Sequence, residues 1–152
     1  MSQDSLLEFA RMMNEVIPAI AQGFARRQAV KFYKCKLTLS QILILDFLNR
    51  QGKTRMTDIA NFMRVTTAAM TGIVERLVRD GYALRVYNPE DRRIIKVKLT
   101  SRGSALIKQI NEQRRKMLIK VFGRISEADR QHYLRILMQI KDILVKENAA
   151  LK

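Results

Sequence analysis

Apolar residues recur at steps of three and four along residues 4–34, which is the spacing of one face of an α-helix. The apolar positions of this stripe are Leu6, Phe9, Met13, Val16, Ile17, Ile20 and Phe24. Pro18 is expected to kink this helix or to restart it, because proline lacks the amide hydrogen that an interior turn requires. The stripe is longer than one domain's core needs. We therefore expect part of it to pack against a second subunit, with an ordinary core-facing stripe as the alternative.

The middle of the chain carries three shorter helical patterns. Thr38 and Gln41 form a capping box for the first, which Gly52 ends.

The next two helices are separated by a short turn. Thr57 is expected to cap a helix over residues 58–63, and Thr66 or Thr67 to cap the following one, which stops at Gly81. Apolar residues of this last helix can point inward: Met70, Ile73, Val74 and Leu77. Small residues occupy its exposed first turns: Thr67, Ala68, Thr71 and Gly72. Small uncharged side chains let a helix approach base edges closely, and a surface helix shaped only by solvation would carry more Glu, Lys and Gln.

Two alternating runs, residues 83–87 and 95–99, predict a β-hairpin. Leu84 and Val86 lie on one side of the first run, and Ile95, Val97 and Leu99 lie on one side of the second. Residues 88–91 have strong turn chemistry, and Arg92 and Arg93 follow at the projecting tip. Arginine is favoured in narrow minor grooves, where the negative potential is deepest. The order is thus helix, turn, helix and then a basic hairpin.

The last third of the chain predicts two further helices. Thr100 is expected to cap the first, and Ser126 with Asp129 marks the start of the second. Each carries an apolar stripe, and we find no repeat, linker or low-complexity segment.

The chain has 152 residues and a formal charge of +15, from 29 Lys and Arg against 14 Asp and Glu. This length suits one domain over residues 1–152. So large a positive charge indicates a polyanionic partner, either nucleic acid or an anionic membrane surface.

The single cysteine, Cys35, allows no disulfide within the chain and fits a reducing cytosol. The N-terminus lacks the pattern of a secretory signal, and no apolar run approaches the roughly 18 residues of a membrane span. We expect a cytoplasmic protein that does not bind membranes directly.

Residues 65–85 and 89–100, with the following Ser101-Arg102-Gly103, resemble the MarR family of winged-helix transcriptional regulators. The family's wing pattern is present as Asp91, Arg93, Val97, Leu99, Thr100 and Gly103. The resemblance is specific over residues 37–103 and only architectural for the terminal helices. It implies a mainly α fold with a β-hairpin wing, in which helices over 4–34 and 104–150 interlock in a homodimer on double-stranded DNA.

The resemblance also implies which residues contact DNA. The recognition helix and the turn before it would contribute Arg64, Thr66, Thr67, Ala68 and Thr71 to the major groove and the phosphates. The wing would place Arg93 with Arg92 in the minor groove, with Asp91 orienting a wing arginine. Arg76 would brace the wing or touch phosphate. Many relatives respond to small aromatic or phenolic ligands bound between the DNA-binding region and the dimer helices.

We therefore expect a sequence-specific transcriptional regulator, acting as a repressor on a palindromic operator. One alternative is an architectural protein that binds DNA without reading its sequence. Another is a thiol-oxidation sensor that uses Cys35, which lies between Lys34 and Lys36, two cations that would lower its pKa. An enzyme is not expected, since the chain has one histidine, His132, and no catalytic or cofactor-binding motif. No metal site is expected either.

Overall fold

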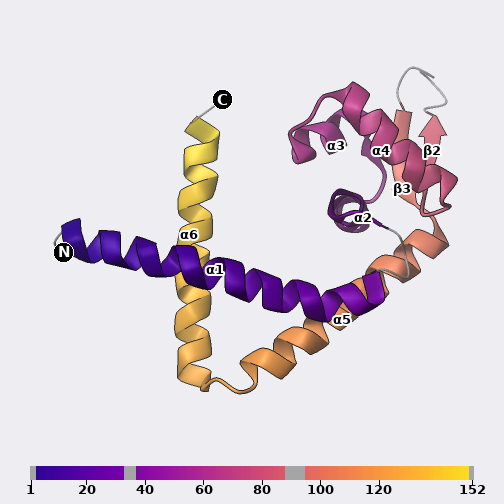
Figure 1. Cartoon of the computed structure of the whole chain (residues 1–152). Coiled ribbons are helices and arrows are strands. Elements are labelled where there is room, and N and C mark those ends of the chain that lie inside the picture. Colours follow the sequence, from indigo (N-terminus) through magenta and orange to yellow (C-terminus); the bar gives the residue numbers. More distant parts are fainter. Residues whose placement is uncertain (1–2, 33–36, 88–94, 151–152) are drawn as a thin grey trace. The chain divides into compact units, whose positions relative to one another are not determined.

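The computed structural model describes residues 3–32, 37–87 and 95–150 and is mainly helical with one small sheet (Figure 1). The helices are α1 (Gln3–Phe32), α2 (Leu39–Gln51), α3 (Met56–Met63), α4 (Thr67–Arg79), α5 (Ser101–Phe122) and α6 (Glu127–Ala150). The strands are β1 (Thr54–Arg55), β2 (Ala83–Tyr87) and β3 (Ile95–Leu99). The predicted fold class, mainly α with a β-hairpin, is confirmed.

The chain divides within α5 into two compact parts, residues 1–108 and 109–152. The first part includes a region that we call the central region, residues 37–108. Its core forms where α2, α3 and α4 meet the sheet. The fully buried side chains are Ile44, Leu45, Leu48, Ile59, Met70, Val74, Leu77, Val97 and Ile107. Each such side chain contributes about 1.5–3 kcal/mol when it leaves water, so this cluster fixes α4 against its neighbours.

The three strands form an antiparallel sheet in the order β1-β3-β2. Strand β1 has only two residues, too few to show a period, and the sequence did not predict it. Arg85 and Thr54 both lie opposite Val97, and opposed residues share a face. Val97 is fully buried. Arg85 therefore lies on the inner face of the sheet, and its neighbours Leu84 and Val86 lie on the outer face.

Most of the predicted helix boundaries are confirmed. The capping box at Thr38 is formed, because the Thr38 amide donates to Gln41 Oε1 at 2.8 Å and the Gln41 amide donates to Thr38 Oγ1 at 3.3 Å. Thr66 caps α4 by accepting from the Ala69 amide at 3.2 Å. The predicted cap at Thr57 is wrong: α3 begins at Met56, and Arg55 takes the N-cap position without a side-chain hydrogen bond. Strand β1 leads directly into this helix, which leaves no room for a separate cap.

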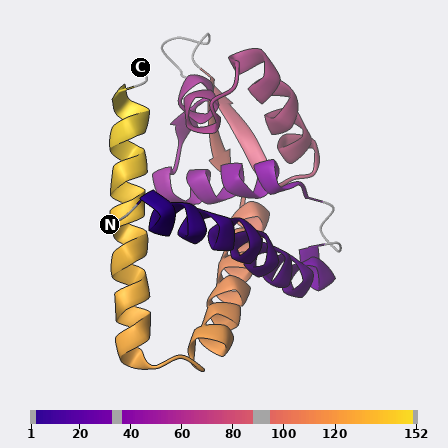
Figure 2. The ribbon, with the colours of Figure 1, turned by 60° about the vertical axis from the view of Figure 1, so that its left-hand side comes forward.

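Helix α1 continues through Pro18 as one helix (Figure 2), so the predicted restart at Pro18 is wrong. Proline removes the amide donor for the carbonyl four residues earlier, which belongs to Asn14. The residues on both sides, 14–22, are exposed. Water can therefore solvate that carbonyl, and the lost hydrogen bond does not end the helix.

Both terminal helices expose large apolar side chains. On α1 these are Leu6, Leu7, Phe9, Met12, Val16, Ile17 and Ile20. On α6 they are Tyr133, Leu134, Ile136, Leu137, Met138, Ile140, Ile143, Leu144 and Val145. Among the described residues, no helix is long and apolar enough to cross a membrane.

The turn after α4 is joined to the start of α5 by Thr100. Its hydroxyl donates to the Gly81 carbonyl at 2.7 Å and accepts from the Gly103 amide at 3.0 Å, which confirms Thr100 as the cap of α5. Gly81 has φ +75°, a left-handed conformation that glycine adopts without strain. Gly103 lies so close to Tyr82 that an added Cβ would stand 2.0 Å from the Tyr82 carbonyl oxygen.

Gly103→Ala should destabilise the fold by about 1–3 kcal/mol, because the new methyl group collides with backbone that cannot move aside. Thermal unfolding measures this as a lower Tm. Gly72→Ala is the matched control. Its Cβ meets no atom within 4 Å, and replacing glycine inside a helix should stabilise by about 0.5–1 kcal/mol. Equal effects of the two substitutions would contradict the close packing at Gly103.

Candidate nucleic-acid interface

Helix α4 has one buried face and one exposed face. Met70, Val74 and Leu77 are fully buried, whereas Ile73, which we also expected to point inward, is only half-buried. Thr67, Ala68 and Gly72 are exposed, and Thr71 is half-buried. The buried anchors hold the helix by one side, so that its small uncharged residues stand outward over its first turns.

Two threonine hydroxyls on this face already have one partner each within the protein. The Thr66 hydroxyl oxygen accepts from the Ala69 amide, which leaves its hydrogen free to donate to a phosphate. The Thr71 hydroxyl donates to the Thr67 carbonyl at 2.8 Å, which leaves its oxygen lone pairs free to accept. Thr71 thus matches the amino groups that adenine and cytosine present in the major groove.

The turn before α4 is held by Arg64. It has φ +53°, and among the described residues it is the one non-glycine with a positive φ. Its amide donates to the carbonyls of Ala60 and Asn61, which closes the end of α3. The Arg64 side chain is exposed beside the start of α4, and the Arg76 side chain is exposed further along that helix. Both guanidinium groups are accessible to a polyanion.

Several predicted site residues lie outside the described residues. These are Asp91, Arg92 and Arg93, which follow β2 in the sequence, and Cys35. Their roles stay predictions. Strands β2 and β3, which precede and follow residues 88–94 in the sequence, are paired from Ala83↔Leu99 to Tyr87↔Ile95.

Arg85 is a residue of this surface that our sequence reasoning missed. Its Nη2 lies 3.4 Å from Glu75 Oε1 on α4, and its Nε is buried without a hydrogen-bond partner among the residues that the structure describes. Arg85 also lines a pocket of about 410 Å³ between α4, the start of α3 and the sheet. The other lining residues are Arg55, Met56, Thr57, Thr67, Thr71 and Ile95. The alternation of β2 alone does not show that Arg85 lies on the inner face of the sheet, because this depends on its pairing with Val97.

No group of three or more His, Cys, Asp or Glu side chains in the described part of the chain is arranged to hold a metal ion. His132 on α6 lies instead with its Nδ1 2.9 Å from Arg135 Nη2.

The family model of the MarR family matches residues 37–95, which span α2 to the start of β3. Residues 37–95 therefore match the MarR family. It is 28% identical over 94 residues to the uncharacterized helix-turn-helix transcriptional regulator YpoP of Bacillus subtilis, covering 62% of this chain and 67% of that protein.

A second relative from Bacillus subtilis, the transcriptional repressor YetL, is 27% identical over 133 residues, covering 88% of this chain and 74% of its own. A solved MarR family protein from Bacillus stearothermophilus superposes with a TM-score of 0.79 at 20% identity, covering 95% of this chain and 99% of that chain. This likeness extends the shared fold over the terminal helices. The matched region and the named relatives are those of helix-turn-helix transcriptional regulators, as the sequence predicted.

Thr66→Ala should lower the free energy of unfolding by about 1 kcal/mol, because it removes the N-cap of α4. Thr67→Ala should leave that free energy nearly unchanged, because its side chain is exposed and alanine favours helix. Both substitutions should weaken DNA binding. Chemical unfolding and a DNA titration on the same two samples separate the effects. Equal stability of the two variants would contradict the capping role of Thr66.

Proposed function

We propose that this MarR-family protein is a sequence-specific repressor that binds a palindromic operator as a homodimer. The observation that carries the proposal is the uncharged outer surface of the first turns of α4, with Thr67, Ala68 and Thr71 outward and Met70, Val74 and Leu77 fixed inward. A protein that bound DNA only by charge would gain more from Lys and Arg at these positions. Small hydroxyl and methyl groups suit contact with base edges. Arg64, Arg76 and the wing arginines 92 and 93, oriented by Asp91, would hold the backbone and the minor groove.

The homodimer is supported by the exposed apolar residues of α1 and α6. Leu7 is 67% exposed and Val145 is 60% exposed, and neighbours of the same kind extend along both helices. A monomer rarely leaves so many large apolar side chains in contact with water. A two-fold symmetric dimer would bury the same surface of each subunit and present two recognition helices to the duplex.

The repressor role is supported by the relatives, since YetL is named a transcriptional repressor. A dimer that covers an operator can block transcription without any catalytic step. A repressor binds chromosomal DNA, and we therefore also expect this protein to lie in the cytoplasm.

Selection of bound duplexes from a random pool tests the function. A sequence-specific dimer should enrich a palindrome with half-sites about one helical turn, roughly 10 bp, apart. It should prefer that site to random duplex by roughly a thousandfold or more. A preference near one would instead support an architectural protein that does not read sequence. Repeating the selection with peroxide tests the Cys35 alternative, since a thiol sensor should lose binding and a Cys35→Ser variant should keep it.

A small aromatic effector is the second element of the proposal. The pocket of about 410 Å³ lies within the size range of small-molecule sites. A phenolic acid bound there would place its carboxylate on Arg85, whose Nε has no partner. It would also cover Thr67 and Thr71, so that ligand and DNA would compete for one surface.

Calorimetry with 2-hydroxybenzoate as probe tests this element. The wild type should bind the probe and lose operator affinity in its presence, whereas Arg85→Met should bind it at least about tenfold more weakly, because the charged partner is gone. Neutral 2-hydroxybenzamide is the control and should bind weakly to both. Equal binding of the probe to wild type and Arg85→Met would remove this pocket from the proposal.

A further inference from the structure

Strand pairing gathers five side chains on the outer face of the sheet, the face turned away from the buried core. Lys96 of β3 lies opposite Val86 of β2, and Lys98 lies opposite Leu84. Arg55 of β1 lies opposite Lys96 on the other side. Directly opposed residues of an antiparallel pair share a face of the sheet. We call the surface of these residues the outer sheet face.

The cations of the outer sheet face have no acidic partner within the described part of the chain. Arg55 and Lys98 are exposed, and Lys96 is half-buried. Arg55 and Lys96 face each other directly, and like charges in this position destabilise an antiparallel pair. An anionic partner on this face would therefore relieve a repulsion as well as form new ion pairs.

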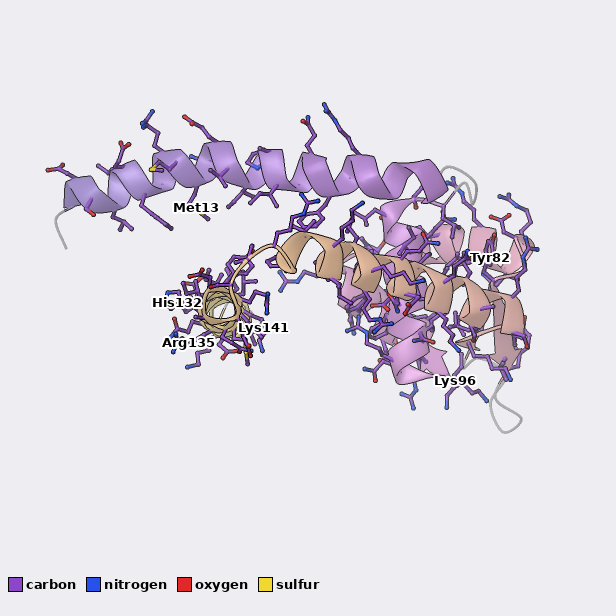
Figure 3. The ribbon with its side chains drawn as sticks, turned by 90° about the horizontal axis from the view of Figure 1, so that it is seen from below. Met13, Tyr82, Lys96, His132, Arg135 and Lys141 are labelled. Atoms are coloured by element: carbon purple, nitrogen blue, oxygen red, sulfur yellow. The ribbon has the colours of Figure 1, made fainter. Side chains whose placement is uncertain are left out.

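An apolar strip runs beside these cations along β2. It consists of Leu84 and Val86, which are both half-buried and lie next to Lys98 and Lys96. In Figure 3, Lys96 lies at the end of the sheet away from Tyr82, so the charged row and the apolar row extend side by side along the sheet. A DNA backbone offers phosphates to the cations but no large apolar group to the strip, whereas a protein segment offers carboxylates and apolar side chains together. This composition favours an acidic protein segment over a nucleic acid.

The recognition helix lies on the other side of the sheet. Arg85 and Ile95, which belong to the inner face, line the pocket together with Thr67 and Thr71 of α4. A duplex seated on those threonines therefore need not cover the outer sheet face. A second macromolecule can reach this face while DNA is bound.

We propose that the outer sheet face binds an acidic segment of a partner protein. Its carboxylates contact Arg55, Lys96 and Lys98, and one of its apolar side chains covers Leu84 and Val86. Lysine suits such a contact, because its methylene stem packs against an apolar side chain while its ammonium group meets a carboxylate. The face thereby connects the DNA-bound regulator to a second protein, and only this last point rests on the proposed function.

The probe is a labelled peptide of repeated Glu-Glu-Leu-Leu, titrated against the full-length protein by fluorescence anisotropy. Successive side chains of an extended chain alternate in direction, so this repeat presents both carboxylates and leucines on each side. Two comparison peptides carry glutamine in place of glutamate or serine in place of leucine. Each should bind at least about fivefold more weakly than the probe, because one lacks the charges and the other the apolar surface.

The variant Lys96→Gln/Lys98→Gln should bind the probe about fivefold more weakly or less, because it loses two ion pairs. Arg55 is left unchanged, since it also lines the pocket beside α4. Lys120→Gln/Arg124→Gln is the matched control: it removes the same charge from exposed positions at the end of α5 and in the turn after it. The control should bind the probe as the wild type does.

The variant Val86→Thr tests the apolar strip without a change in charge. It keeps a β-branched side chain, which suits a strand, and it should weaken probe binding by about threefold because apolar surface is lost. The wild type bound to its selected operator should take up the probe with nearly the affinity of the free protein.

Three results would overturn the acidic-partner contact. The first is equal probe binding by Lys96→Gln/Lys98→Gln and its control, and the second is equal binding of the probe and the serine peptide. The third is a loss of operator affinity in Lys96→Gln/Lys98→Gln that the control does not share, which would assign the face to DNA. A failure of sequence-specific function is distinguishable, because it would appear in the wild type as equal affinity for operator and random duplex, and the titrations without DNA would still test the contact.

Discussion

The burial of Met70, Val74 and Leu77 is the interaction on which the rest of this molecule depends. These three side chains, at steps of four and three, fix both the depth and the rotation of α4 in the central region. A rotation by one residue, about 100°, would turn Thr67 and Thr71 inward and present apolar surface to solvent. The same packing that stabilises the fold therefore decides which groups can meet DNA.

Around this fixed helix the protein tolerates features that a purely structural surface would avoid. Arg85 keeps a buried Nε without a partner, Arg64 adopts a left-handed conformation, and Arg55 faces Lys96 across two strands. Each of these features is unfavourable in the isolated chain. Two of them, the buried Arg85 Nε and the facing charges of Arg55 and Lys96, concern cations, whose charge a polyanionic partner would compensate.

The sequence predicted what depends on local patterns. The periodicity of α4, the box of Thr38 and Gln41, and the two alternating runs of the hairpin each lie within a few neighbouring residues, and they also carried the family resemblance. The sequence could not predict which side chains the pairing of the strands brings together. Arg85 reached the inner face through its pairing with Val97, and Lys96 met Arg55 through a two-residue strand without a period of its own.

Chemical protection of guanine N7 on the selected operator tests the central claim most directly, because this atom lies in the major groove. If α4 reads the major groove, the guanines should be protected in two blocks about one helical turn, roughly 10 bp, apart. Both blocks should disappear in the Ala68→Lys variant, because a bulky lysine then stands on the outer face of α4. Binding without any protected guanine in the major groove, or protection that survives Ala68→Lys, would contradict it.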